Sequence, residues 1–154
     1  LSGNPRGLTQ MPIYTNSGSI ASYNFTTISP DAKKIVVGFR GVAGTGTLLI
    51  RFMVAGATVS SGYAGAYSGG SNAIITTTYT SGCNMLNAIS GNVYGTLTLV
   101  NLGGNIWSGS STVHDTTGPS YQFTTCAISL AGPVTGLTLS ATSITAGSVG
   151  VVYE

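Results

Sequence analysis

The sequence predicts an all-β fold, an antiparallel β-sandwich of jelly-roll type with about ten strands. Segments of roughly six to ten residues, rich in β-branched and aromatic side chains, recur along the whole chain. Gly, Ser and Asn interrupt these segments about every ten residues, as turns do. No segment shows the period of an amphipathic helix, so no helix is expected to connect parallel strands. Short consecutive strands joined by turns therefore favour antiparallel pairing.

We assign strands wherever apolar and polar side chains alternate or β-branched residues run together. Residues 33–42 alternate cleanly, because Ile35 and Phe39 share one face while Lys34 and Arg40 share the other. No repeat of about 20 to 50 residues is visible, which argues against a solenoid or a propeller. The expected strands cover residues 21–28, 33–42, 48–54, 58–67, 74–79, 85–89, 94–102, 106–114 and 121–130, followed by a closing pair at 137–139 and 147–153.

The last stretch, residues 138–154, organises the predicted sheet. Apolar side chains recur at about every second position from Ile144 onward, which predicts a strand with Val149, Val151 and Tyr153 in the core. The Gly147-Ser148 step shifts this alternation by one residue, which predicts a β-bulge. An apolar strand at the end of a chain needs neighbours to pair its backbone groups. We therefore expect it to lie within the core sheet.

The length of 154 residues suits one domain with a sizeable core. We expect residues 1–18, with Pro5 and Pro12, to be a connector and residues 19–154 to form the β-sandwich domain. The start at Leu1, in mid-connector, indicates a processed C-terminal piece of a longer protein; a mature secreted protein is the alternative. No run of 18 apolar residues is present, so no membrane insertion is expected.

Formal charge is scarce, since Asp, Glu, Lys and Arg make up 5% of the residues against roughly 25% in an average soluble protein. Ser, Thr, Asn and Gly must then cover the surface, as in rigid extracellular or virion β-proteins. Weak charge repulsion favours the pairing of this neutral surface with other subunits. The cations argue against nucleic-acid binding, because they are few, scattered and not interleaved with aromatic residues. They are Arg6, Lys33, Lys34, Arg40 and Arg51.

The two cysteines, Cys83 and Cys126, have two interpretations. They can form one bridge that closes a long loop. We favour two buried free thiols that act as small hydrophobic side chains, because nothing in the sequence places them close together. Two cysteines and a single histidine do not make a metal site.

Catalytic motifs are absent, since the chain contains no GxSxG, GxxxxGK or HExxH pattern. Glycoside hydrolysis needs two carboxylates, and the acidic residues are only Asp31, Asp115 and Glu154. His114 and Asp115 are adjacent, but neighbours on a strand point to opposite faces, which favours a turn start or an inter-subunit contact over a catalytic dyad. We therefore expect no enzyme activity and no cofactor.

Aromatic side chains are the remaining candidates for ligand contact. Trp107 is flanked by small polar residues and can stack on a sugar, although packing in the core is the favoured role. We expect the segments 61–71 and 105–121 to converge at the end of the sandwich away from the connector. Neither segment contains a cation, which favours a neutral ligand such as a glycan. The candidate ligand-binding residues are Tyr63, Tyr67, Trp107, His114, Asp115 and Tyr121.

Three segments carry a resemblance to a known family. They are residues 60–63 (SSGY), residues 91–107 (GNVYGTLTLVNLGGNIW) and above all the ending, residues 144–154 (ITAGSVGVVYE). Over residues 19–154 the chain resembles the C-terminal β-sandwich domain of tailed-phage tail-fibre and virion-surface fibre proteins. Such domains close with a strand of similar form and carry a Trp before a Ser/Gly loop.

The resemblance implies a jelly-roll-like tip on a phage tail fibre or head fibre, commonly trimeric and displayed on the virion surface. It implies attachment to a glycan or other receptor on the host surface, with the N-terminal segment contacting other virion proteins. It carries over no catalytic residue. A capsid-decoration module without a ligand is the first alternative. An enzyme acting on surface polysaccharide and a secreted bacterial adhesin are the others.

Overall fold

A computed structural model describes residues 7–69, 75–117 and 120–154, and the described residues form an all-β, antiparallel fold with no helix. The predicted fold class is confirmed. Since no helix is present in the described ranges, none there is able to cross a membrane. The strands are β1 (Thr9–Gln10), β2 (Tyr14–Thr15), β3 (Ile20–Thr26), β4 (Lys34–Thr45), β5 (Leu48–Val54), β6 (Ala57–Thr58), β7 (Ala64–Gly69), β8 (Ile75–Tyr79), β9 (Cys83–Leu86), β10 (Val93–Gly103), β11 (Ile106–Asp115), β12 (Ser120–Ser129) and β13 (Val134–Tyr153).

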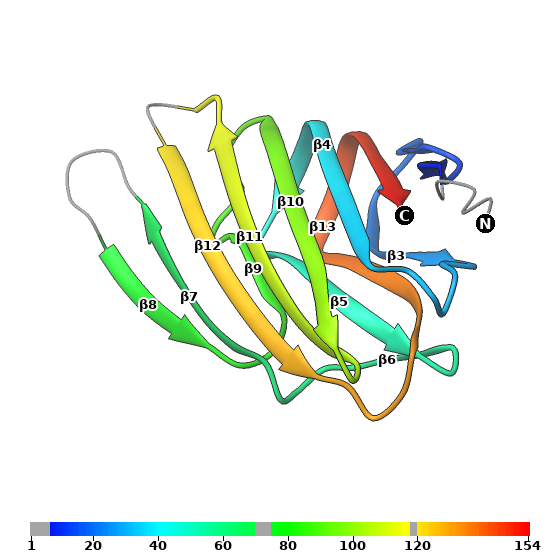
Figure 1. Cartoon of the computed structure of the whole chain (residues 1–154). Coiled ribbons are helices and arrows are strands. Elements are labelled where there is room, and N and C mark those ends of the chain that lie inside the picture. Colours follow the sequence, from blue (N-terminus) through cyan, green and yellow to red (C-terminus); the bar gives the residue numbers. More distant parts are fainter. Residues whose placement is uncertain (1–6, 70–74, 118–119) are drawn as a thin grey trace.

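The strands form one curled sheet that folds back on itself as two layers (Figure 1). Its strand order is β6-β5-β13-β4-β10-β11-β12-β7-β8. The large layer runs from the second part of β13 through β4, β10, β11, β12 and β7 to β8. The small layer contains β5, β6 and β9, together with β3 and the first part of β13. Strand β13 therefore belongs to both layers and joins them.

Strand β13 changes partners along its 20 residues. Its first part pairs with β5 and β3, and its second part pairs with β4, β1 and β2. The sequence predicted two separate strands here, whereas the structure has one continuous strand that turns the corner. The predicted bulge is confirmed, because the register with β4 shifts between Ala146 and Ser148. Gly147 has a φ of 94°, and a Cβ atom there would lie 2.4 Å from the Gly41 carbonyl oxygen.

The hydrophobic core fills the space between the two layers. Phe52 of β5 and Trp107 of β11 meet there, with ring centroids 5.3 Å apart. Val149 and Val151 are buried, as the alternation at the end of the sequence predicts, whereas Tyr153 is half-buried and packs against the edge of the core. The inward positions of strands from both layers thus form a single core, which holds the sheet curled.

The segment expected to be a connector is partly built into the sheet. Strands β1 and β2 pair with the second part of β13, and Met11 between them is buried. Leu8 and Ile13 of the same segment are 68% and 62% exposed. Residues 1–6, including Arg6, lie outside the described residues. The described part of this segment therefore supports the last strand and also exposes two apolar side chains.

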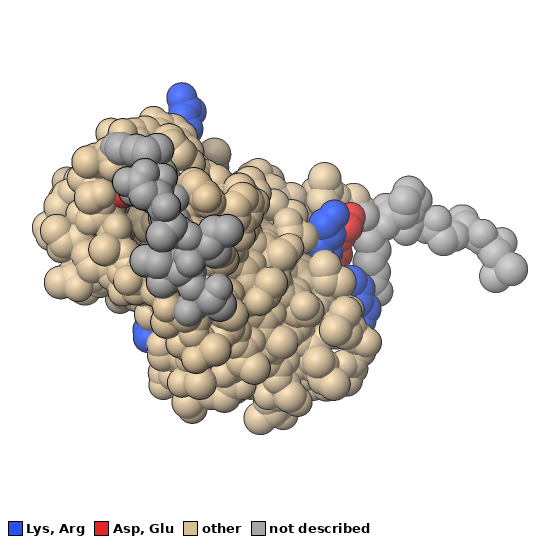
Figure 2. Space-filling model, turned by 90° about the vertical axis from the view of Figure 1, so that its left-hand side faces the viewer, with Lys and Arg blue, Asp and Glu red and all other residues tan. Residues whose placement is uncertain are grey.

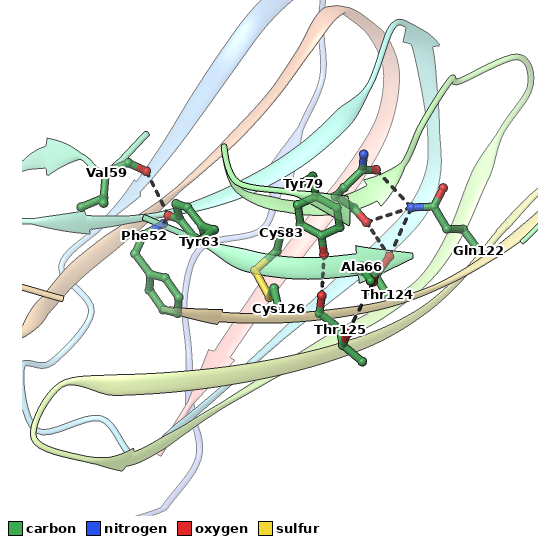
Figure 3. The surroundings of a disulfide bond; sticks show 11 residues. Phe52, Val59, Tyr63, Ala66, Tyr79, Cys83, Gln122, Thr124, Thr125 and Cys126 are labelled. Carbon is green, nitrogen blue, oxygen red and sulfur yellow. Dashed lines mark hydrogen bonds between the residues drawn. A yellow bond between two sulfur atoms is a disulfide. The ribbon is translucent and has the colours of Figure 1, made fainter. Parts of the chain in front are cut away.

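A disulfide joins Cys83 of β9 to Cys126 of β12, so the expectation of two free thiols is wrong. The bond ties the small layer to the large one (Figure 3). A buried amide network lies next to it, in which the Gln122 side-chain nitrogen donates to the backbone and side-chain oxygens of Asn84. The curl of the sheet lays β9 against β12, and this proximity is not encoded in the spacing of the cysteines.

Candidate functional site

Four exposed side chains form a row across the outer face of the large layer. β10 pairs Tyr94 with Arg40 of β4 on one side and with His114 of β11 on the other. β12 then places Tyr121 opposite His114. Side chains at directly opposed positions of antiparallel strands share a face. Tyr94 and Tyr121 are 46% and 40% exposed, so the row is open to solvent.

Phe123 extends this row toward the middle of the sheet. It follows Tyr121 at the next outward position of β12 and is 51% exposed. The two rings meet edge to face, with centroids 5.4 Å apart. We call Tyr94, His114, Tyr121 and Phe123 the outer aromatic site. Phe123 also borders an open groove of about 390 Å³, whose other lining residues are Ala66, Tyr67, Ser68, Ser110, Ser111, Thr112, Thr124 and Thr125.

Hydroxyl groups surround the outer aromatic site on β10, β11 and β12. Thr96, Ser110, Thr112 and Thr125 are exposed on neighbouring outward positions of β10, β11 and β12. The only formally charged residue in these three strands is Asp115, which points inward. Figure 2 shows the same scarcity on the side of the molecule that carries β7 and β8, where most of the visible surface is uncharged and the charged atoms lie toward its edges. The site is therefore aromatic and hydroxyl-rich, and Arg40 of β4 is the formally charged side chain that strand pairing places beside it.

A bulge in β4 determines where the Tyr94 ring lies. The register between β4 and β10 shifts between Val93 and Tyr94, which leaves Gly41 as the extra residue on β4. Gly41 has a φ of 63°, and a Cβ atom there would lie 3.3 Å from the Tyr94 hydroxyl oxygen. The Tyr94 hydroxyl therefore lies over the bulge, next to Arg40.

Two predicted ligand-binding residues, Tyr63 and Trp107, are core residues, each 2% exposed. The Tyr63 hydroxyl accepts a hydrogen bond from the Phe52 backbone N–H and donates one to the Val59 carbonyl (Figure 3). Burial raises the pKa of Tyr63 to about 12, although the Phe52 bond lowers it in part. The core role favoured for Trp107 is confirmed. The strand predicted at 58–67 is also interrupted, because the chain turns inward at Tyr63 between β6 and β7.

Asp115 is a third predicted residue that does not reach the surface, with 0% exposure. One carboxylate oxygen accepts hydrogen bonds from the Ser90 and Gly91 backbone N–H groups and the Ser90 hydroxyl, and the other accepts one from the Thr117 N–H. Burial acts to raise the pKa of Asp115, but these hydrogen bonds outweigh it and the pKa is lowered. Asp115 therefore fixes the two loops that flank β10 and β11, and its side chain is closed off from solvent.

Tyr67 lies on the opposite face of the sheet from the outer aromatic site. Its partner position on β12 is Thr124, which is buried, and its ring stacks on Tyr79 with centroids 6.1 Å apart. Tyr79 in turn donates a hydrogen bond to the Thr125 carbonyl (Figure 3), and burial raises its pKa to about 12.

Of the six predicted ligand-binding residues, only His114 and Tyr121 come together on an exposed face. Residues 70–71 and 118–119 of the predicted loops lie outside the described residues.

A second apolar group lies at the other end of the outer face, beside the β10–β11 hairpin. Val100, Leu102 and Ile106 are 39%, 67% and 46% exposed. Val100 and Leu102 also line an open groove of about 400 Å³. We call these three side chains the aliphatic patch. Six of the eight large apolar side chains that are exposed in the described ranges thus belong to β10, β11 or β12.

The acidic residues do not form a metal or acid–base centre with Asp115. Asp31 and Glu154 line an open cavity of about 400 Å³ near the end of β13, and the Glu154 carboxylate lies 3.7 Å from the Lys34 ammonium. Within the described ranges, no group of three or more potential metal ligands is found. Asp115 has its own set of hydrogen bonds at the opposite end of β4 and β10.

Three residues of this face, Arg40, Tyr94 and Phe123, are not among the residues predicted from the sequence. All three lie in strands that were predicted, at outward positions of the alternation. For Tyr94 and Phe123, the available signal was a large aromatic side chain on the solvent face of a strand, where Ser or Thr is the rule in this chain. Which outward residues become neighbours depends on strand pairing, which the sequence pattern does not give.

No family model matches the chain, and comparisons with curated proteins and with solved structures also find no match.

Proposed function

We propose that this protein is a surface appendage of a tailed-phage virion that binds a glycan on the host surface through the outer aromatic site. The observation that carries the binding role is the exposure of Tyr94, Tyr121 and Phe123 among hydroxyl groups on a rigid sheet. Aromatic rings present flat apolar surface that suits the apolar face of a sugar, while hydroxyl side chains suit sugar hydroxyls. A preformed sheet loses little conformational entropy on binding.

The virion role is supported by the sequence resemblance and by composition. The ending at residues 144–154 is the most specific part of the resemblance. A charge-poor surface suits a subunit held within an assembly, and a disulfide suits an extracellular location. In this proposal the protein is a homotrimer, its N-terminal segment contacts other virion proteins, and it binds its ligand without catalysis.

Binding of the purified protein to host cells or their isolated surface glycans tests the proposal. We expect Tyr121→Ala and Phe123→Ala each to weaken binding about tenfold or more, since each removes an exposed ring. Ile13→Ala serves as the control, because it removes an exposed apolar side chain from the N-terminal segment. Unchanged binding by both aromatic variants, with melting temperatures equal to the parent, would contradict the proposal.

A capsid-decoration module is the second candidate, favoured by the exposure of Leu8 and Ile13 on a segment that is paired with β13. Such a module would attach to the virion through this segment and bind no glycan. Leu8→Ser and Ile13→Ser would then abolish incorporation into particles, while the aromatic variants would change nothing. Glycan binding by the parent protein separates the two candidates.

A further inference from the structure

We propose that the glycan bound at the outer aromatic site is acidic and that Arg40 binds its carboxylate. This inference rests on the proposed function and names the chemical class of the ligand. The sequence favoured a neutral ligand because neither predicted loop contains a cation. Strand pairing changes this expectation, because β4 brings the cation Arg40 directly opposite Tyr94.

The Arg40 guanidinium is available for a ligand. It is exposed and makes no hydrogen bond or ion pair with any residue in the described ranges. Asp115 does not serve as its partner, because its carboxylate is buried and points inward while Arg40 is exposed on the outer face. Glu154 pairs with Lys34 instead, at the other end of β4. Arg40 therefore presents five unused N–H donors beside an aromatic ring.

Arg40 lies next to the outer aromatic site, whereas the other described cations lie far from it. Lys34 lies six positions away on the same strand, roughly 20 Å along β4. Arg51 lies in the small layer, where its side chain donates to the Ser81 carbonyl and the Ser140 hydroxyl. Lys33 precedes Lys34 at that same distant end of β4. Among the described residues, a preference of the outer aromatic site for an acidic ligand therefore comes from Arg40 or from His114 two strands away.

The spacing fits a sugar that carries a carboxylate. Adjacent strands are about 4.8 Å apart, so Arg40 and the Tyr94 backbone are separated by roughly one sugar ring, and Tyr121 lies two strands further on. A carboxylate on Arg40 can accept two parallel hydrogen bonds from the guanidinium fork. The ring that bears it then lies at Tyr94, and the following sugar lies toward Tyr121 and Phe123.

Matched pairs of oligosaccharides test the inference. The probes end in glucuronic, galacturonic or N-acetylneuraminic acid, and each is compared by calorimetry with the same oligosaccharide after reduction of its carboxyl group to an alcohol. For at least one pair, we expect the parent protein to bind the acid about tenfold more tightly, with a preference that weakens as salt is added. Arg40→Gln should abolish this preference, so that the acid and its reduced form bind equally tightly. Arg40→Lys should retain part of it.

The outcomes separate this inference from the proposed function. If the parent prefers no acid over its reduced form, the acidic ligand is wrong. If Arg40→Gln keeps the preference, the role given to Arg40 is wrong. The proposed function still holds in either case, provided that Tyr121→Ala weakens binding to host cells. If Tyr121→Ala and Phe123→Ala leave that adsorption unchanged, the proposed function fails as well.

Discussion

Cys83 and Cys126 are bonded across the two layers, with Cα atoms 5.5 Å apart, although 43 positions separate them in the sequence. A crosslink over so long a loop stabilises a fold mainly by restricting the unfolded chain. We expect the double variant Cys83→Ala/Cys126→Ala to lose roughly 2 to 4 kcal/mol of unfolding free energy. Denaturant titration of the parent with and without reductant measures the same quantity. Equal midpoints in both conditions would show that the bond is not formed in solution.

Gly147 gives a second stability prediction. Gly147→Ala places a Cβ atom 2.4 Å from the Gly41 carbonyl oxygen and forces a side chain onto a φ of 94°. We expect a loss of at least about 1 to 2 kcal/mol, seen as a lower melting temperature. Gly150→Ala in the same strand is the matched control, because the atom nearest to its new Cβ is 3.8 Å away. Similar melting temperatures for both variants would show that the bulge tolerates a side chain.

These two sites illustrate what the sequence can and cannot predict. Alternation predicted the bounds of β5, the burial of Val151 and the bulge at Gly147, because each follows from the direction of neighbouring side chains along one strand. The Cys83–Cys126 bond depends instead on how strands far apart in sequence are arranged. The same limit applies to the site, where β4 and β10 bring Arg40 beside Tyr94 across 54 positions of sequence.

The burial of Tyr63 was unpredictable for a different reason. Its neighbours are Ser, Gly and Ala, which are typical of an exposed loop. What places the ring inside is the pair of hydrogen bonds that its hydroxyl makes to the backbone at Phe52 and Val59. Such contacts satisfy a buried polar group without leaving a sequence pattern.

Asp115 gives a pH prediction. The pKa of this carboxyl is lower in the folded state than its ordinary value, because the folded loops donate hydrogen bonds to the charged form. Its contribution to stability is therefore complete above the unfolded pKa of about 4 and is lost as the pH falls below that value toward the folded pKa. We expect Asp115→Asn to lose about 2 to 3 kcal/mol at neutral pH, and the difference from the parent to shrink in acid. Denaturant titrations between pH 7 and pH 2.5 measure this difference, and a gap that stays constant would contradict the role given to Asp115.

Assembly gives the last prediction. The aliphatic patch exposes Val100, Leu102 and Ile106. Because only 5% of the residues are charged, little electrostatic repulsion opposes apolar contact between copies. We expect light scattering to find a trimer at micromolar concentration. Leu102→Asp/Ile106→Asp should convert it to a monomer, because burying two carboxylates at an interface is costly. Ser61→Asp adds a charge at an exposed loop residue and should leave the trimer intact. A parent protein that stays monomeric would rule out the trimer. A trimer that persists in the double variant would place its interface on another surface.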